Sequence, residues 1–115
     1  MMILYGIPNC DTVKKARAWL AAQGKAHVLH DFKKQGVPGD QLALWVQSVG
    51  WEALLNRKGT TWRKLAADLQ AAAGNSAGAQ SLMQMQPSVI KRPVVDWGDG
   101  VITVGFDAGD WQHRL

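Results

Sequence analysis

The chain of 115 residues has few of the features that mark secreted, membrane-embedded or nucleic-acid-binding proteins. Its single cysteine excludes an intramolecular disulfide framework. No long apolar run follows a basic start, so neither a secretory signal nor a membrane span is visible. The 13 Lys and Arg residues lie mostly in pairs, so the net charge of +4 does not by itself indicate nucleic acid. We therefore expect a reduced, cytoplasmic protein with no direct nucleic-acid partner and no membrane partner.

The length predicts a single domain over residues 1–115 with one core, because chains of this size rarely divide further. The 6 tryptophans run from Trp19 to Trp111 without a regular period. Such a spread is typical of core and groove-lining residues rather than of repeats or base-stacking platforms.

The first part of the chain predicts a β-α-β unit. Residues 2–6 are expected to form a strand, and apolar residues at helical spacing predict a helix from Asp11 to Gly24. Residues 26–32 are expected to form a second, parallel strand. The loop that carries Cys10 then lies at the carboxyl edge of the sheet, where open α/β sheets bind ligands.

In the rest of the chain the spacing of apolar residues changes twice, first to a helical spacing and then to that of short strands. Residues 37–86 read as a helical insert, with one helix ending at Gly50, a second running from Thr60 or Thr61 to about Ala73, and a third reaching Pro87. Afterwards two short strands are expected at 93–97 and 101–106, with a hairpin turn at 98–100 and a final helix capped by Asp107. The order predicts an α/β fold whose core segments, 1–33 and 87–115, flank the insert.

Cys10 stands where the first strand gives way to the first helix. Helix N-termini carry unpaired N–H groups and partial positive charge, which favour a thiolate over a thiol. Lys14 follows one helical turn later, and Asn9 and Thr12 offer local hydrogen bonds, whereas the charge of Asp11 opposes ionisation. The alternative is that Cys10 is an inert, small hydrophobic residue.

The third residue after Cys10 is Val13, so a Cys-x-x-Cys redox pair is excluded. Any redox cycle must then end with an external thiol, for which glutathione is the obvious candidate. A metal site formed with His27, His30 and His113 is weakly supported, because the first two would point to opposite faces of a strand. We predict that the protein holds no metal.

Two arginines, Arg57 and Arg92, occur where the chain is expected to change direction. A guanidinium group pairs with oxyanions in a bidentate manner, so two arginines converging on Cys10 would lower its pKa and hold an anion. The alternative is that each is a surface arginine lying over apolar residues.

Three segments carry a family resemblance, and they occur in order along nearly the whole chain: YGIPNCDTVKKA at 5–16, LLNRKGTTWR at 54–63 and PSVIKRP at 87–93. Together they resemble the arsenate reductase (ArsC/Spx) family, most closely its YffB branch. The resemblance implies a thioredoxin-like fold, a mixed four-stranded sheet with a helical insert between the β-α-β and β-β-α halves. It also implies glutathione-dependent thiol chemistry with Cys10 as nucleophile, Arg57 and Arg92 as oxyanion-holding residues and Pro93 as a cis proline.

The chain departs from arsenate reductases of this type, which have a third arginine in the last strand. Residues 102–107 contain no cation. We therefore expect a glutathione-dependent thiol/disulfide reductase with weak or no arsenate reduction. Its catalytic residue is Cys10, and its predicted anion- and glutathione-binding residues are Asn9, Lys14, Arg57, Arg92 and Pro93.

Glutathione is the expected co-substrate and partner, with a glutaredoxin as the alternative resolving thiol. One other reading is a non-catalytic regulator like the Spx proteins, which dock on RNA polymerase and usually sense oxidation through the Cys-x-x-Cys pair that Val13 removes here. Another is a glutathione-binding protein without turnover.

Overall fold

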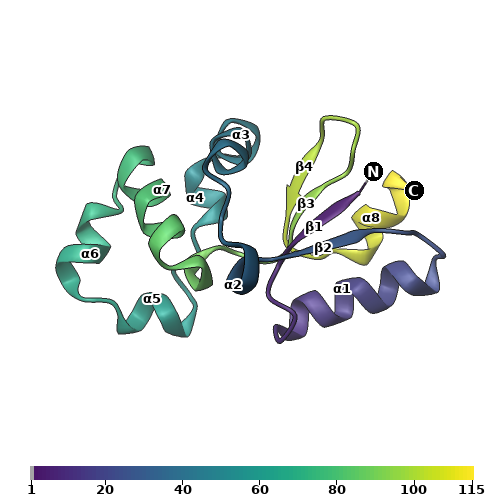
Figure 1. Ribbon diagram of the computed structural model, residues 1–115, viewed down its shortest axis with the longest axis horizontal. Coiled ribbons are helices and arrows are strands. Elements are labelled where there is room, and N and C mark those ends of the chain that lie inside the picture. The colour runs from purple at the N-terminus through teal and green to yellow at the C-terminus, as the bar shows by residue number, and fades with distance from the viewer. Residues whose placement is uncertain (1) are drawn as a thin grey trace. The chain divides into compact units, whose positions relative to one another are not determined.

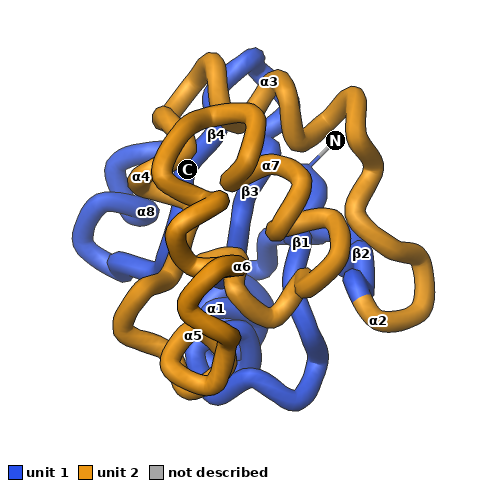
Figure 2. The backbone as a smooth tube through the Cα atoms, turned by 90° about the vertical axis from the view of Figure 1, so that its left-hand side faces the viewer, with its two compact units in different colours: residues 1–32, 92–115 blue, residues 33–91 orange. Residues whose placement is uncertain are grey.

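The computed structural model describes residues 2–115, which form two compact units coloured separately in Figure 2. The first unit combines the chain up to Phe32 with Arg92–Leu115, and the second is Lys33–Lys91. The expected core began again at Pro87, whereas residues 87–91 group with the second unit. None of the helices among residues 2–115 has the length and apolar character needed to cross a membrane.

Within the described part of the chain, the first unit contains a four-stranded sheet in the order β2-β1-β3-β4 (Figure 1). The strands are β1 (Ile3–Gly6), β2 (Val28–Asp31), β3 (Val94–Asp96) and β4 (Ile102–Val104). β1 pairs in parallel with β2, whereas the β1–β3 and β3–β4 pairs are antiparallel. The predicted mixed sheet is thereby confirmed, with strands a residue or more shorter than expected.

The helices α1 (Asp11–Ala22) and α8 (Ala108–Arg114) cover one face of this sheet. Leu4 of β1 lies opposite Val95 of β3, and both belong to the same buried cluster as Trp111 of α8. The other members of this cluster are Met2, Val13, Ala16 and Leu20. The apolar residues at helical spacing therefore form the core-facing side of α1, as the sequence predicts.

Trp111 is the centre of an aromatic group in this core. Its side chain is 1% exposed. The rings of Phe106, Trp97 and Trp19 meet it edge-on, with centroids 4.8, 5.1 and 6.0 Å away. Edge-to-face pairs at these distances add to the stabilisation from burial. The tryptophans of this unit thus have the structural role that their irregular spacing indicates.

A close approach at Gly6 brings the end of β1 against α1. A methyl group at Gly6 would lie 2.9 Å from Cγ2 of Val13, a β-branched side chain that is fully buried. Glycine therefore allows the strand and the helix to pack this tightly. The short turn that follows is closed by a 3.1 Å hydrogen bond from the Cys10 N–H to the Ile7 carbonyl.

The strand predicted over 26–32 is shorter in the structure. β2 ends at Asp31, which pairs with Gly6, the last residue of β1. Phe32, expected in this strand, instead begins the short helix α2 (Phe32–Gln35). The strand ends there because β1 offers no further residue for pairing.

The second unit consists of short helices (Figure 1). They are α3 (Gly39–Val49), α4 (Trp51–Leu54), α5 (Thr60–Lys64), α6 (Ala67–Ala72), α7 (Ser76–Met85) and the 3₁₀ turn η1 (Pro87–Val89). Their buried side chains include Leu42, Trp45, Leu54, Leu82, Met83, Val89 and Ile90. The predicted insert thus consists of helices and short connections, although α4 has no counterpart among the predicted helices.

Residues 87–91 belong to this unit because they run beside the end of α4. Leu55 and Ile90 form a β-bridge. The Asn56 N–H donates to the Val89 carbonyl at 2.8 Å, and the Lys91 N–H donates to the Leu54 carbonyl at 2.7 Å. These bonds fix the loop that carries Arg57 against the segment that ends at Lys91.

The single helix predicted from Thr60 or Thr61 to Ala73 is wrong. The chain is extended at Leu65 and Ala66, which separate α5 from α6. The side-chain amide of Gln70 donates to the Trp62 carbonyl at 2.7 Å, so this carbonyl has a partner outside the helix. The same carbonyl accepts the Leu65 N–H at 3.1 Å, so a tight turn and a side-chain donor take the place of the Ala66 N–H that a continuous helix would provide.

Candidate active site

Cys10 is the residue that precedes the first turn of α1. Its backbone is extended, with φ −95° and ψ 128°, and its carbonyl accepts the Lys14 N–H at 2.9 Å. The side chain is partly exposed and packs against the edge of the buried cluster. This position combines the open end of a helix with access from solvent, which is the setting that a reactive thiol needs.

The environment of the sulfur lowers the pKa of the Cys10 thiol below its ordinary value. Burial opposes this change and raises the pKa. It is outweighed by the Val13 N–H, which donates to the sulfur, by the hydrogen bond and charge of the Arg92 side chain, and by the Thr12 N–H. Donors and a cation favour the thiolate because they stabilise only the charged form. The carboxylate of Asp11, expected to oppose ionisation, is not among the causes.

The topology of the sheet explains why Arg92 reaches Cys10. β3 runs antiparallel to β1, and Val94 at its start lies opposite Tyr5 near the end of β1. The residues just before Val94 therefore lie at the same edge of the sheet as the loop that follows β1. Arg92 is half-buried there, and its peptide bond to Pro93 is cis, as the resemblance implied. The buried Pro93 accepts the Gly105 N–H at 2.8 Å through its carbonyl.

Asn9 and Lys14 lie beside the cysteine in sequence and contact each other. The Lys14 ammonium donates to Oδ1 of Asn9 at 3.5 Å, and both residues are exposed. The cation that lowers the thiol pKa is Arg92 rather than Lys14. These two residues thus flank the thiol as an exposed polar pair.

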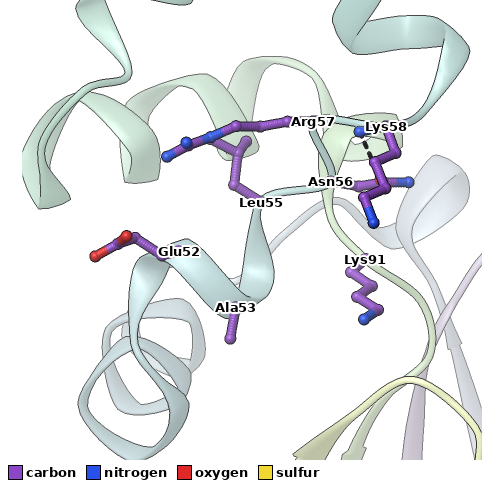
Figure 3. Close-up of a pocket in the computed structure, with 7 residues that line it drawn as sticks. All are labelled: Glu52, Ala53, Leu55, Asn56, Arg57, Lys58 and Lys91. Carbon is purple, nitrogen blue, oxygen red and sulfur yellow. Dashed lines mark hydrogen bonds between the residues drawn. The ribbon is translucent and has the colours of Figure 1, made fainter.

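Arg57 belongs to the second unit and lies in the loop between α4 and α5. Its guanidinium group lies over the ring of Trp51, 5.4 Å from the centroid. Arg57 lines two cavities in this unit. One, of about 340 Å³, also has Trp51 and Trp62 in its wall. The other, of about 380 Å³, is shown in Figure 3 and contains Lys58 and Lys91.

The histidines have contacts other than metal binding. His27, expected in the second strand, lies before β2 and accepts a hydrogen bond from Nε of Arg17 at 3.3 Å. His30 packs against the ring of Tyr5, with centroids 4.9 Å apart. Within residues 2–115, no three His, Cys, Asp or Glu side chains gather in a way that could hold a metal ion.

Sequence reasoning missed several residues of these sites. Thr12 is predicted to offer a local hydrogen bond, and its backbone amide is one of the donors to the sulfur. The Val13 amide, also a donor, is predicted only as part of the helix terminus. Asn56, Lys58 and Lys91 were not predicted to line a cavity. A signal for the lysines was present, because each predicted anion-binding arginine has a lysine as its direct neighbour.

Comparison with known proteins agrees with this fold. The model of the ArsC family matches residues 5–113. The chain belongs to the ArsC family. Its structure superimposes on that of a protein named YffB with a TM-score of 0.92 and 42% identity, covering 100% of this chain and 99% of the other. The predicted membership and the resemblance to the YffB branch are therefore confirmed.

Two curated proteins are also similar in sequence to this chain. An uncharacterised protein of Haemophilus influenzae (strain ATCC 51907 / DSM 11121 / KW20 / Rd) is 38% identical over 97% of this chain and 96% of its own length. The global transcriptional regulator Spx of Streptococcus agalactiae serotype V is 27% identical over 83% of this chain and 69% of its own length. The relatives of this chain thus include a transcriptional regulator as well as an uncharacterised protein.

Proposed function

We propose that this ArsC-family protein is a cytoplasmic, glutathione-dependent thiol/disulfide reductase with Cys10 as its nucleophile. The observation that carries the proposal is the environment of the sulfur, which receives hydrogen bonds from two backbone amides and from Arg92. A thiolate is the reactive form in thiol–disulfide exchange, so these donors increase the reactive fraction at neutral pH. No metal takes part in this chemistry.

The reaction proceeds in two displacements. The Cys10 thiolate attacks one sulfur of a disulfide substrate, the substrate S–S bond breaks, and the other sulfur leaves as a thiolate that takes a proton from solvent. A glutathione thiolate then attacks the substrate-derived sulfur and releases the Cys10 thiolate. Arg92 stabilises Cys10 both as the attacking group and as the leaving group, because both are anionic.

Glutathione is the co-substrate in this proposal, and a glutaredoxin is the alternative source of the resolving thiol. The residues proposed to contact glutathione are Asn9, Lys14, Arg57, Arg92 and Pro93. Arg57 would pair with one of its carboxylates, and Arg92 would lie beside the reacting sulfur. The segment from Ile102 to Asp107, which includes β4, carries no cation. Disulfide reduction is therefore proposed ahead of arsenate reduction, which would leave more negative charge to be stabilised.

Replacement of Cys10 by Ser tests the proposal. The wild-type protein should reduce the mixed disulfide of glutathione and cysteine in an assay coupled to glutathione reductase, and Cys10→Ser should fall to the uncatalysed rate. Its circular dichroism and its binding of S-methylglutathione should be unchanged, since the side chains are similar in size. A Cys10→Ser variant with undiminished turnover would show that the thiol is not the nucleophile.

A second candidate is a regulator that binds RNA polymerase, favoured by the similarity to Spx of S. agalactiae. It predicts that the tagged protein retains purified RNA polymerase on a resin and that Cys10→Ser binds equally well. The enzyme proposal instead predicts turnover without polymerase binding.

A further inference from the structure

The cavity beside Arg57 has the size of a small-ligand site. Its volume is about 380 Å³, and its wall comes from the end of α4, the loop after it and the segment that returns at Lys91 (Figure 3). Small-molecule pockets commonly measure about 300–1,000 Å³. The lining residues are Glu52, Ala53, Leu55, Asn56, Arg57, Lys58 and Lys91.

The charges in this wall are unbalanced. Arg57, Lys58 and Lys91 contribute three cations, and Glu52 contributes one carboxylate. Among residues 2–115, none of these four side chains forms an ion pair, whereas Arg114 and Asp110 elsewhere pair at 3.0 Å. Cations gathered around a cavity without anionic partners raise the local concentration of anions and can pair with carboxylates.

Hydrogen bonds fix the backbone from which these side chains project. The Lys58 N–H donates to Oδ1 of Asn56 at 3.1 Å, and the Lys91 N–H donates to the Leu54 carbonyl at 2.7 Å. The guanidinium group of Arg57 lies over the Trp51 ring. The site is therefore built on fixed chain positions rather than on a mobile tail.

The charged side chains lie in two groups on different sides of the cavity. In Figure 3 the side chains of Arg57 and Glu52 lie on the left and those of Lys58 and Lys91 lie on the right. A cation and a carboxylate on the same side of the cavity suit the α-carboxylate and α-ammonium of an amino acid. The lysines suit a second carboxylate, so the ligand that matches both sides is a dicarboxylate with one free amino-acid group.

We propose that this cavity binds a γ-glutamyl peptide, with the zwitterionic γ-glutamyl end between Arg57 and Glu52 and the terminal carboxylate at Lys58 and Lys91. The choice of glutathione as this peptide rests on the proposed function. The new elements are the site and the roles of Glu52, Lys58 and Lys91. In this assignment Glu52 is a specificity-determining residue, because it recognises the ammonium group that simple dianions lack.

Binding of S-methylglutathione tests the site, since this probe cannot react with Cys10. Isothermal titration should show that Lys58→Ala/Lys91→Ala weakens binding by about tenfold or more through the loss of charge-assisted contacts. Lys64→Ala removes an exposed lysine of α5 that does not line the cavity, and it should bind as the wild type does. Circular dichroism should be the same for all variants.

Glu52→Gln gives a second, sharper readout. It should weaken binding of S-methylglutathione but leave unchanged the binding of an analogue whose γ-glutamyl group is replaced by glutaryl, which lacks the ammonium. Equal effects on both probes would overturn the role of Glu52. Wild-type affinity in Lys58→Ala/Lys91→Ala, or no binding by the wild type, would overturn the site.

The proposed reductase activity and the proposed binding site can be disproved independently of each other. Cys10-dependent turnover together with wild-type binding by the lysine variant would remove the cavity from the mechanism and leave the reductase intact. Binding that depends on the cavity, without turnover, would leave a γ-glutamyl-peptide-binding protein.

Discussion

Arg92 in the first unit and Arg57 in the second have the same side chain and the same predicted role, yet their surroundings differ. Arg92 is half-buried and donates to the sulfur of Cys10, so it changes the chemistry of another residue. Arg57 is exposed over Trp51 and lines a cavity with two lysines. An arginine in a family motif can therefore either activate a protein group or be available to bind a ligand, and only its contacts distinguish the two roles.

The two units also differ in how they are held together. In the first, strands distant in the sequence pair with one another, and helices cover the resulting sheet. In the second, short helices follow one another with brief connections. We expect large substitutions to be most costly where such distant segments meet.

The largest expected difference in stability is between alanine substitutions of two tryptophans. Trp111→Ala should lower the free energy of unfolding by about 3–5 kcal/mol, because the ring is fully buried among other aromatic residues. Trp51→Ala in the second unit should cost much less, because that ring is partly exposed. Urea denaturation followed by circular dichroism measures both. Equal losses would contradict the contrast, and Trp111→Phe should retain part of the stability.

Alanine substitutions of two glycines should change stability by smaller amounts, and they can be compared directly. Gly6→Ala would bring a methyl group to 2.9 Å from the stiff, buried Val13, and we expect a loss of about 1–3 kcal/mol in the free energy of unfolding. Gly39→Ala would meet the amide nitrogen of Gln84 at the same distance of 2.9 Å. That exposed, flexible side chain can move away, so Gly39→Ala should be nearly neutral.

A double variant checks the cause of the Gly6 effect. If crowding against Val13 is responsible, adding Val13→Ala to Gly6→Ala should cost less than Val13→Ala costs in the wild-type background. Strictly additive losses in the same urea titrations would place the strain elsewhere.

The pH dependence of Cys10 alkylation tests whether Arg92 activates the thiol. The wild-type rate with iodoacetamide should have its midpoint below that of free cysteine, because the folded protein lowers the thiol pKa. Arg92→Ala removes a hydrogen bond and a cation, so the pKa should rise and alkylation at neutral pH should slow. Lys25→Ala, which removes an exposed cation beyond the end of α1, should leave the midpoint unchanged. A midpoint in Arg92→Ala equal to that of the wild type would show that Arg92 does not activate the thiol.

Much of the fold could be predicted because its longest elements follow simple periods. The apolar spacing in α1 and α3 and the Gly-Asp-Gly turn between β3 and β4 each express a local rule. The turn has positive φ at Gly98 (84°) and Gly100 (88°), and Oδ1 of Asp99 accepts the Val101 N–H at 3.0 Å. Such features depend on neighbours in the sequence and can therefore be inferred from it.

The wrong predictions concern positions whose local structure depends on a partner elsewhere in the fold. The end of β2 is set by the length of β1, and the break between α5 and α6 is accompanied by the bond from Gln70 to Trp62. At the site, the helix terminus beneath Cys10 could be predicted from its surrounding residues. The cavity at Lys58 and Lys91 could not, because it depends on bonds between segments more than thirty positions apart, such as that from Lys91 to Leu54.

The position of the second unit within the chain has a consequence for synthesis. A ribosome makes Cys10 early, but it adds Arg92 only after the whole of Lys33–Lys91. β3, which takes an inner place in the sheet beside β1, follows directly after Arg92. A nascent chain therefore carries a thiol that lacks the Arg92 guanidinium until translation has entered the last quarter of the chain, so full activation of the cysteine waits for the segment that completes the sheet.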